Sequence, residues 1–118
     1  MDNDEIQPDA DQRYADLSGR LLIGADQTGA ELSGANLTDA DLSGARLSKA
    51  TLGGARLSKA TLGGARLSKA TLGGAKMNGT QLQGAGLGGA NLRGANLSGA
   101  KMNGAKELDD AIGYKLEG

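Results

Sequence analysis

The residues of this chain that could do chemistry are carboxylates, cations and hydroxyls, because the 118-residue sequence contains no His and no Cys. Their absence removes the imidazole acid–base group, thiolate nucleophiles, disulfides and most zinc sites. Asp26, Glu31 and Asp41 are expected to lie near one another. A catalytic carboxylate pair, however, needs a pocket that separates two acidities. We interpret these three as exposed charges, and the sequence predicts no enzyme and no catalytic, cofactor or metal site.

A glycine-rich stretch at residues 84–89, GAGLGG, satisfies the G-x-G-x-x-G pattern of a dinucleotide-binding loop. That fingerprint requires a preceding strand, a following helix and a downstream acid. Glycine also recurs at five-residue intervals through most of the chain. We therefore interpret this stretch as part of a repeat, with no cofactor bound to it.

Charge is segregated along the chain. Residues 1–42 contain ten acidic and two basic residues, residues 43–104 contain nine basic and no acidic residues, and the total is only −1. Six of the basic residues belong to three identical copies of the decapeptide ARLSKATLGG at 45–74. These six form the candidate interaction surface: Arg46, Lys49, Arg56, Lys59, Arg66 and Lys69.

The elements that must position these charges are five-residue units. From Ala15 to Gly104 the chain divides into 18 units without an insertion, and the third residue is Leu in 15 of them. The exceptions are Gln27, Met77 and Met102. The first residue is almost always Ala, and the fifth is usually Gly. A repeat of this regularity has to be interpreted before any other pattern.

A period of five does not fit an α-helix, in which about 100° per residue would spread the leucines around the cylinder. In an extended segment the first and third residues point the same way, and Ser-Gly or Gly-Gly pairs then supply a turn. Four such units would close a square coil, so residues 20 apart would stack. Arg46, Lys49, Arg66 and Lys69 would share one face, with Arg56 and Lys59 on the opposite face.

The units Ala35–Asp39, Ala40–Gly44 and Ala95–Gly99 resemble the A(D/N)LXX signature of the pentapeptide-repeat family. The resemblance implies an all-β fold, a right-handed quadrilateral β-helix, with the first and third residues inside. We expect this β-helix at 15–104. Residues 1–14 are acidic and are expected to be largely disordered, although 10–14 are in register with the repeat.

Two segments break the pattern. The unit Arg20–Gly24 carries large residues in place of small ones, so we expect the first coil to be distorted. Residues 105–118 leave the register, and the spacing of Leu108, Ile112 and Leu116 predicts a short helical C-terminal cap. Since members of the family commonly dimerise through C-terminal elements, the chain is expected to be a monomer or a homodimer through this end.

The function predicted from these features is that of a structural scaffold or protein-interaction solenoid, whose six cations dock an acidic protein surface. The identical decapeptides indicate a recent duplication or deliberate design; a designed repeat need have no specific activity. The absence of an apolar leader or an apolar stretch long enough to span a bilayer predicts a cytoplasmic protein.

Two alternatives remain open for the partner. Some pentapeptide-repeat proteins mimic DNA, which implies binding or protection of a topoisomerase such as gyrase, but mimicry needs negative charge along the whole rod. Nucleic-acid binding by the stacked cations is the other alternative. It is disfavoured because no aromatic side chain is placed to stack on bases and no helix to read a groove.

Overall fold

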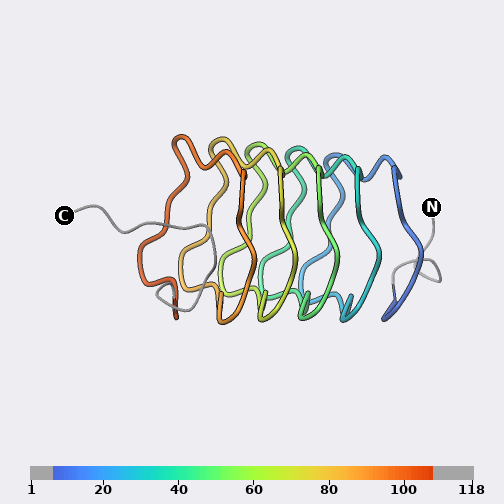
Figure 1. The fold of residues 1–118 in the computed structure, drawn as a ribbon, viewed down its shortest axis with the longest axis horizontal. Coiled ribbons are helices and arrows are strands. Elements are labelled where there is room, and N and C mark those ends of the chain that lie inside the picture. Colours follow the sequence, from blue (N-terminus) through green and yellow to red (C-terminus); the bar gives the residue numbers. More distant parts are fainter. Residues whose placement is uncertain (1–6, 108–118) are drawn as a thin grey trace.

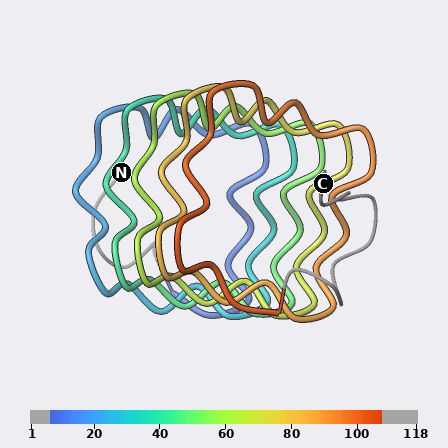
Figure 2. The same ribbon diagram turned by 90° about the vertical axis from the view of Figure 1, so that its left-hand side faces the viewer.

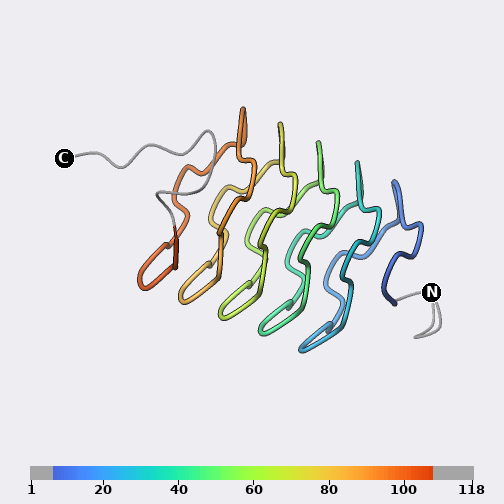
Figure 3. The ribbon, with the colours of Figure 1, turned by 60° about the horizontal axis from the view of Figure 1, so that its bottom comes forward.

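The computed structural model describes residues 7–107, which wind into a stack of coils with a four-sided outline (Figure 1, Figure 2). We number the coils by residue range: coil 1 is 10–29, coil 2 is 30–49, coil 3 is 50–69, coil 4 is 70–89 and coil 5 is 90–107. Coils 1 to 4 each contain four five-residue units, coil 5 is described as far as the third residue of its fourth unit, and each unit begins at a residue whose number is a multiple of five. Corners of successive coils line up in rows along the stack (Figure 3).

The coils pair through single-residue parallel bridges between residues 20 apart, from Asp11 with Glu31 to Gly86 with Lys106. Every bridge joins the second residue of one unit to the second residue of the unit above it. Residues 7–107 contain no helix and no longer strand. The strand segments are this short because each unit turns after its third residue.

Backbone hydrogen bonds hold each unit on both sides. The N–H of Leu17, a third residue, donates to the Asn36 carbonyl of the next coil at 2.8 Å, and the Asn36 N–H donates back to the Ala15 carbonyl at 2.9 Å. The N–H of Gly19, a fifth residue, donates to the Thr38 carbonyl at 2.9 Å. A turn bond from each first-residue N–H to the preceding third-residue carbonyl completes the set, as in Ala15 to Gln12 at 3.1 Å.

The interior is filled by the first and third residues. Leu side chains from Leu17 to Leu92 and Ala side chains from Ala30 to Ala90 are buried, most of them completely. Ala lets neighbouring walls approach, while Leu fills the space between them. Because each coil contacts only its neighbours, stability is a sum of stacking terms along the rod.

Three polar side chains are buried in this interior, those of Gln12, Gln27 and Thr80. Thr80 replaces Ala at a first position, and its hydroxyl donates to the Leu57 carbonyl at 2.7 Å. Gln27 replaces Leu in coil 1 and is fully buried, and neither atom of its amide group has a hydrogen-bond partner within residues 7–107. A buried amide without a partner costs about 1–3 kcal/mol, so Gln27 weakens coil 1.

The ends of the paired region differ from the sequence-based expectations. Residues 10–14 form a unit that pairs with 30–34, so pairing begins before Ala15. The expected distortion at 20–24 is wrong: Leu22 is buried and donates to the Asp41 carbonyl at 2.7 Å, while Leu21 and Ile23 point outward. Leu21 and Ile23 fit because they occupy outward positions, whereas Arg20, at a first position, is half-buried. The helical cap predicted at 105–118 is wrong for residues 105–107, which continue the repeat, since Lys106 pairs with Gly86; residues 108–118 lie outside the described residues.

Candidate interaction surface

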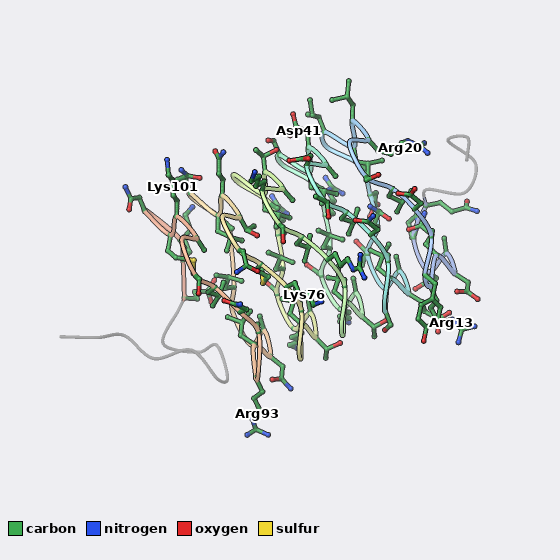
Figure 4. The ribbon with its side chains drawn as sticks, turned by 90° about the horizontal axis from the view of Figure 1, so that it is seen from above. Arg13, Arg20, Asp41, Lys76, Arg93 and Lys101 are labelled. Carbon is green, nitrogen blue, oxygen red and sulfur yellow. The ribbon has the colours of Figure 1, made fainter. Side chains whose placement is uncertain are left out.

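The second residues define four faces of the rod, which we number in chain order. Their members are Asp11, Glu31, Thr51, Thr71 and Asn91 on face 1; Asp16, Asn36, Arg56, Lys76 and Asn96 on face 2; Leu21, Asp41, Thr61, Gln81 and Lys101 on face 3; and Asp26, Arg46, Arg66, Gly86 and Lys106 on face 4. Figure 4 shows Asp41 and Lys101 along one side of the rod, with Arg13 and Arg93 along the opposite side.

The structure places the six predicted residues as two opposite sets. Arg46 and Arg66 pair directly on face 4, and Lys49 stacks below Lys69 through the bond from its N–H to the Ser68 carbonyl at 2.9 Å. Arg56 and Lys59 lie on face 2, with Asp39 in the coil below Lys59. The decapeptide period explains this arrangement, because ten residues make half a coil and carry an identical sequence to the opposite face.

The same register adds two cations that the sequence analysis missed. Lys76 pairs with Arg56 on face 2, and Lys106 occupies the face 4 column above Gly86. Lys106 was assigned to the cap, although its distance of 40 residues from Arg66 was a signal of the shared column. Faces 2 and 4 therefore each carry cations over at least two successive coils.

These cations are not neutralised by the fold. Within residues 7–107 the only ion pair is between Arg13 and Asp11, at 2.9 Å. Like charges stacked at the coil spacing of about 4.8 Å repel each other, although solvent and salt weaken the repulsion. Apart from the attraction between Arg46 and Asp26, the charges on faces 2 and 4 gain no opposite-charge contact within residues 7–107.

The lysines also occupy an unfavourable backbone conformation. The fifth residue of each unit has a positive φ, which 14 described glycines adopt without cost. Lys49, Lys59 and Lys69 adopt it at φ values of 65°, 61° and 61°. A residue with a side chain loses about 1 kcal/mol in this region. Three units thus carry a lysine where glycine would suit the turn better.

The acidic units show a different local chemistry. The Asp16 carboxylate accepts the Ser18 hydroxyl at 2.7 Å and the Ser18 N–H at 3.1 Å, and these bonds lower the pKa of Asp16. Asp41 accepts the Ser43 hydroxyl at 2.6 Å and the Thr61 hydroxyl at 2.8 Å, which likewise lower its pKa. These carboxylates stabilise the turns of their own units.

The pKa values of Asp11 and Asp26 are also lowered by hydrogen bonds within their own units, and nearby arginines lower them further. The side-chain hydrogen bond from Arg13 lowers the pKa of Asp11 to about 2. The Thr28 hydroxyl and N–H lower the pKa of Asp26, and Arg46 in the next coil lowers it further.

The three carboxylates that the sequence analysis grouped lie on different faces: Asp26 on face 4, Glu31 on face 1 and Asp41 on face 3. No pocket encloses them as a pair.

The glycine-rich stretch forms a notch in face 4. The unit 85–89 has glycine at all three outward positions, so coil 4 presents bare backbone there. Two adjoining depressions of about 390 and 380 Å³ result, and they share Ser68 and Glu107 in their walls. The Glu107 carboxylate lies against Gly88. The notch follows from missing side chains, as expected for a repeat unit; Leu87 of the same unit is buried in the core.

Within the part of the chain that the structure describes, no three His, Cys, Asp or Glu residues are grouped as metal ligands. No helix among residues 7–107 is long and apolar enough to cross a bilayer.

The family model that matches this chain is described as pentapeptide repeats, and it matches residues 13–48, 45–84 and 75–106. Among solved structures, a pentapeptide-repeat protein from the thylakoid lumen of Arabidopsis thaliana is 36% identical, with a TM-score of 0.74 over 80% of this chain and 63% of that one. HetL from Nostoc sp. strain PCC 7120, involved in heterocyst differentiation regulation, is 34% identical, with a TM-score of 0.41 over 88% of this chain and 60% of that one.

QnrB1, a plasmid-mediated fluoroquinolone resistance protein, is 24% identical, with a TM-score of 0.47 over 88% of this chain and 65% of that one. The comparison with curated proteins gives no match. This chain thus spans less than two thirds of the length of each of these solved structures. The expected right-handed quadrilateral β-helix is confirmed.

Proposed function

Since this chain belongs to the pentapeptide-repeat family, whose fold leaves the partner open, we propose that it is a non-enzymatic interaction solenoid that docks an acidic protein surface. The observation that carries the proposal is the stacking of unneutralised cations on two opposite faces, with Arg46 paired to Arg66 on face 4 and Arg56 paired to Lys76 on face 2. A stack of Leu and Ala needs none of these charges.

The strained lysines support the same proposal. Glycine at the fifth position would remove both the positive-φ cost and the repulsion between Lys49 and Lys69. The side chains of Lys59 and Lys69 also run along the rod, because a methyl group at Gly79 would lie 3.6 Å from the Lys59 Cγ and one at Gly89 only 3.3 Å from the Lys69 Cγ. All three lysines are exposed, so their charges remain in solvent. This is a suitable arrangement for electrostatic docking, which raises association rates and selects acidic partners.

The buried interior argues against an enzyme. Leu and Ala side chains fill the coils, and the depressions on the surface are lined by glycine backbone, Ser68 and charged residues. Catalysis needs a shielded site that holds groups of separated acidity, and the described carboxylates are spread over different faces.

The test is a pull-down from cell lysate with three proteins: the parent, a face 4 variant and a face 1 control. The face 4 variant changes Arg46, Lys49, Arg66 and Lys69 to Glu; the control changes Thr51 and Thr71 to Glu. We expect one acidic protein to be retained by the parent and the control, released by salt and lost from the face 4 variant. Equal retention of every protein by all three folded variants would refute the proposal.

The runner-up, a topoisomerase-directed protein, makes a separate prediction. The described acidic side chains at outward positions of coils 1 and 2 surround the N-terminal end of the rod, while coils 3 and 4 carry none. A DNA mimic would act through the acidic coils. A gyrase supercoiling assay in which the parent and the face 4 variant protect equally would favour this alternative over docking through the cations.

A further inference from the structure

One backbone donor in each unit is left over by the coil-to-coil hydrogen bonds. Between residues 30 and 88, the first, second, third and fifth residues of each unit donate to backbone carbonyls, and the fourth residue does not. Where the second residue is Asp or Asn, its side chain accepts this N–H; in the other units the N–H is open to solvent water or to a bound group. The fourth residue is therefore where this repeat can bind something through its backbone.

In the units with Asp or Asn at the second position, that side chain accepts the outward N–H. Asp16 takes both the N–H and the hydroxyl of Ser18, at 3.1 and 2.7 Å. Asn36 makes the same pair of bonds to Thr38, at 3.1 and 2.7 Å. The fourth residue thus supplies two parallel donors to one oxygen atom, and the chain itself shows that a carboxylate oxygen fits them.

The basic units keep the donors and lose the acceptor. Ser48, Ser58 and Ser68 are fourth residues like Ser18, but Arg stands at the second position of their units. Neither their N–H groups nor their hydroxyls have a hydrogen-bond partner among residues 7–107. These serines are half-buried, and each lies between an exposed Arg and an exposed Lys of the same unit.

Asp26 shows what a filled site of this kind looks like on a basic face. Its carboxylate accepts the Thr28 hydroxyl at 2.7 Å and the Thr28 N–H at 3.2 Å, directly below Arg46 in the next coil. An oxygen at this position is therefore compatible with a guanidinium one coil away. The same position one coil further along face 4, at Ser48, lies below Arg66 and has no carboxylate of its own.

We propose that each ARLSK unit is a binding site for a side-chain carboxylate of an acidic partner protein. The carboxylate accepts the N–H and hydroxyl of Ser48, Ser58 or Ser68, while the Arg and Lys of that unit supply the positive charge. This inference rests on the proposed function and names the chemistry of its contact. Hydrogen bonds from charged and neutral donors to a carboxylate are directional, so the surface selects placed carboxylates rather than negative charge in general.

The spacing of the sites specifies the partner further. The sites at Ser48 and Ser68 are one coil apart on face 4, which corresponds to about 4.8 Å. Acidic residues four apart on a helix have Cβ atoms about 5–6 Å apart. Face 4 therefore fits a helix that presents two carboxylates on one side. The single site at Ser58 on face 2 fits one carboxylate.

The experiment separates this inference from charge alone by comparing two neutral replacements of Arg46 and Arg66. In R46N/R66N the Asn oxygen takes the N–H groups of Ser48 and Ser68, as Asn96 takes that of Ser98 at 3.0 Å. In R46Q/R66Q the same charge is lost but the donors stay open, since Gln81 makes no such bond to Gln83 within the described chain. Binding of poly-L-glutamate is measured by calorimetry at fixed salt, with thermal unfolding to verify both folds.

We expect the Asn variant to bind poly-L-glutamate about three- to tenfold more weakly than the Gln variant, as expected for lost hydrogen bonds to a charged group. Amide proton shifts provide the second readout: Ser48 and Ser68 should respond to poly-L-glutamate, and Gly53 and Gly73, whose outward N–H groups lie beside Thr51 and Thr71, should not. Equal weakening of both variants, or binding only to duplex DNA, would overturn the carboxylate sites while leaving the basic faces functional. No binding by the parent would overturn the docking proposal itself.

Discussion

The acidic units of coils 1 and 2 and the decapeptides at 45–74 share an interior and differ in their turns. Leu32 and Leu57 are equally buried, and the coil-to-coil hydrogen bonds have the same lengths in both regions. The units of Asp16, Asp26 and Asp41 tie the turn with a carboxylate oxygen and end on glycine, as in Asp41 to Ser43 and Gly44. The units of the decapeptides have no side-chain oxygen that accepts the N–H of the fourth residue. In every second unit they also have Lys in place of Gly at the fifth position.

This difference teaches that the fold and the surface are specified by separate positions. First and third residues determine the stack, whereas second, fourth and fifth residues determine what the rod presents. The Asp or Asn of the family signature has a structural role at the second position, because it accepts the one backbone N–H that the coils leave over. Replacing it with Arg46, Arg56 and Arg66 removes that support and leaves donors for a partner.

The largest effect is expected from a change in the shared interior. Leu57→Lys places a charge among fully buried leucines and should lower the free energy of unfolding by roughly 4 kcal/mol or more. Leu37→Lys should cost about the same amount, because its unit has the same core. Urea unfolding followed by circular dichroism measures both. A small loss at either position would mean that the interiors of the two regions are not equivalent.

A smaller effect is expected from the lysine turns, and it should occur only in the decapeptides. Changing Lys49, Lys59 and Lys69 together to Gly should raise the free energy of unfolding by about 2–3 kcal/mol over the same triple change to Ala. Both variants lose the same charge, but only Gly relieves the positive φ. The single change Lys59→Ala should leave stability within about 0.5 kcal/mol of the parent. Equal stability of the two triple variants would contradict the assignment of strain to these turns.

Much of this division could be predicted from the sequence. A period of five that holds over 18 units fixes the inward positions and the 20-residue register, which places Arg46 beside Arg66. The use of the fourth N–H could not be predicted, because it depends on the rotamer of the second side chain and on the turn geometry. The inward position of Gln27 follows from the register, but the missing partner of its amide is visible only in three dimensions. Lys106 was missed because the pattern fails at the next residue, Glu107.

The smallest effect is expected from acid, and it should be confined to coils 1 and 2. Their carboxylates have lowered pKa values: Asp16, Asp26 and Asp41 through hydroxyl and N–H donors, and Asp11, at about 2, through Arg13. A carboxyl whose pKa is lower in the folded state stabilises the fold above its unfolded value of about 3.9, and this contribution disappears as the pH falls through the folded value. Protection should therefore fall between about pH 4 and pH 2.

Amide hydrogen exchange at pH 5 and pH 2.5 measures this loss unit by unit, after correction for the intrinsic pH dependence of exchange. Coils 1 and 2 should lose protection, whereas residues 45–104 contain no carboxyl side chain and should keep theirs. The control replaces Asp16, Asp26 and Asp41 with Asn, which makes the same turn bonds at position 36 without titrating. Coils 1 and 2 of this variant should retain most of their protection at pH 2.5. If the decapeptides lose protection first in acid, the turn carboxylates do not cause the difference between the two regions. The cause would then be repulsion among the stacked cations, which nothing opposes once the acidic side chains are protonated.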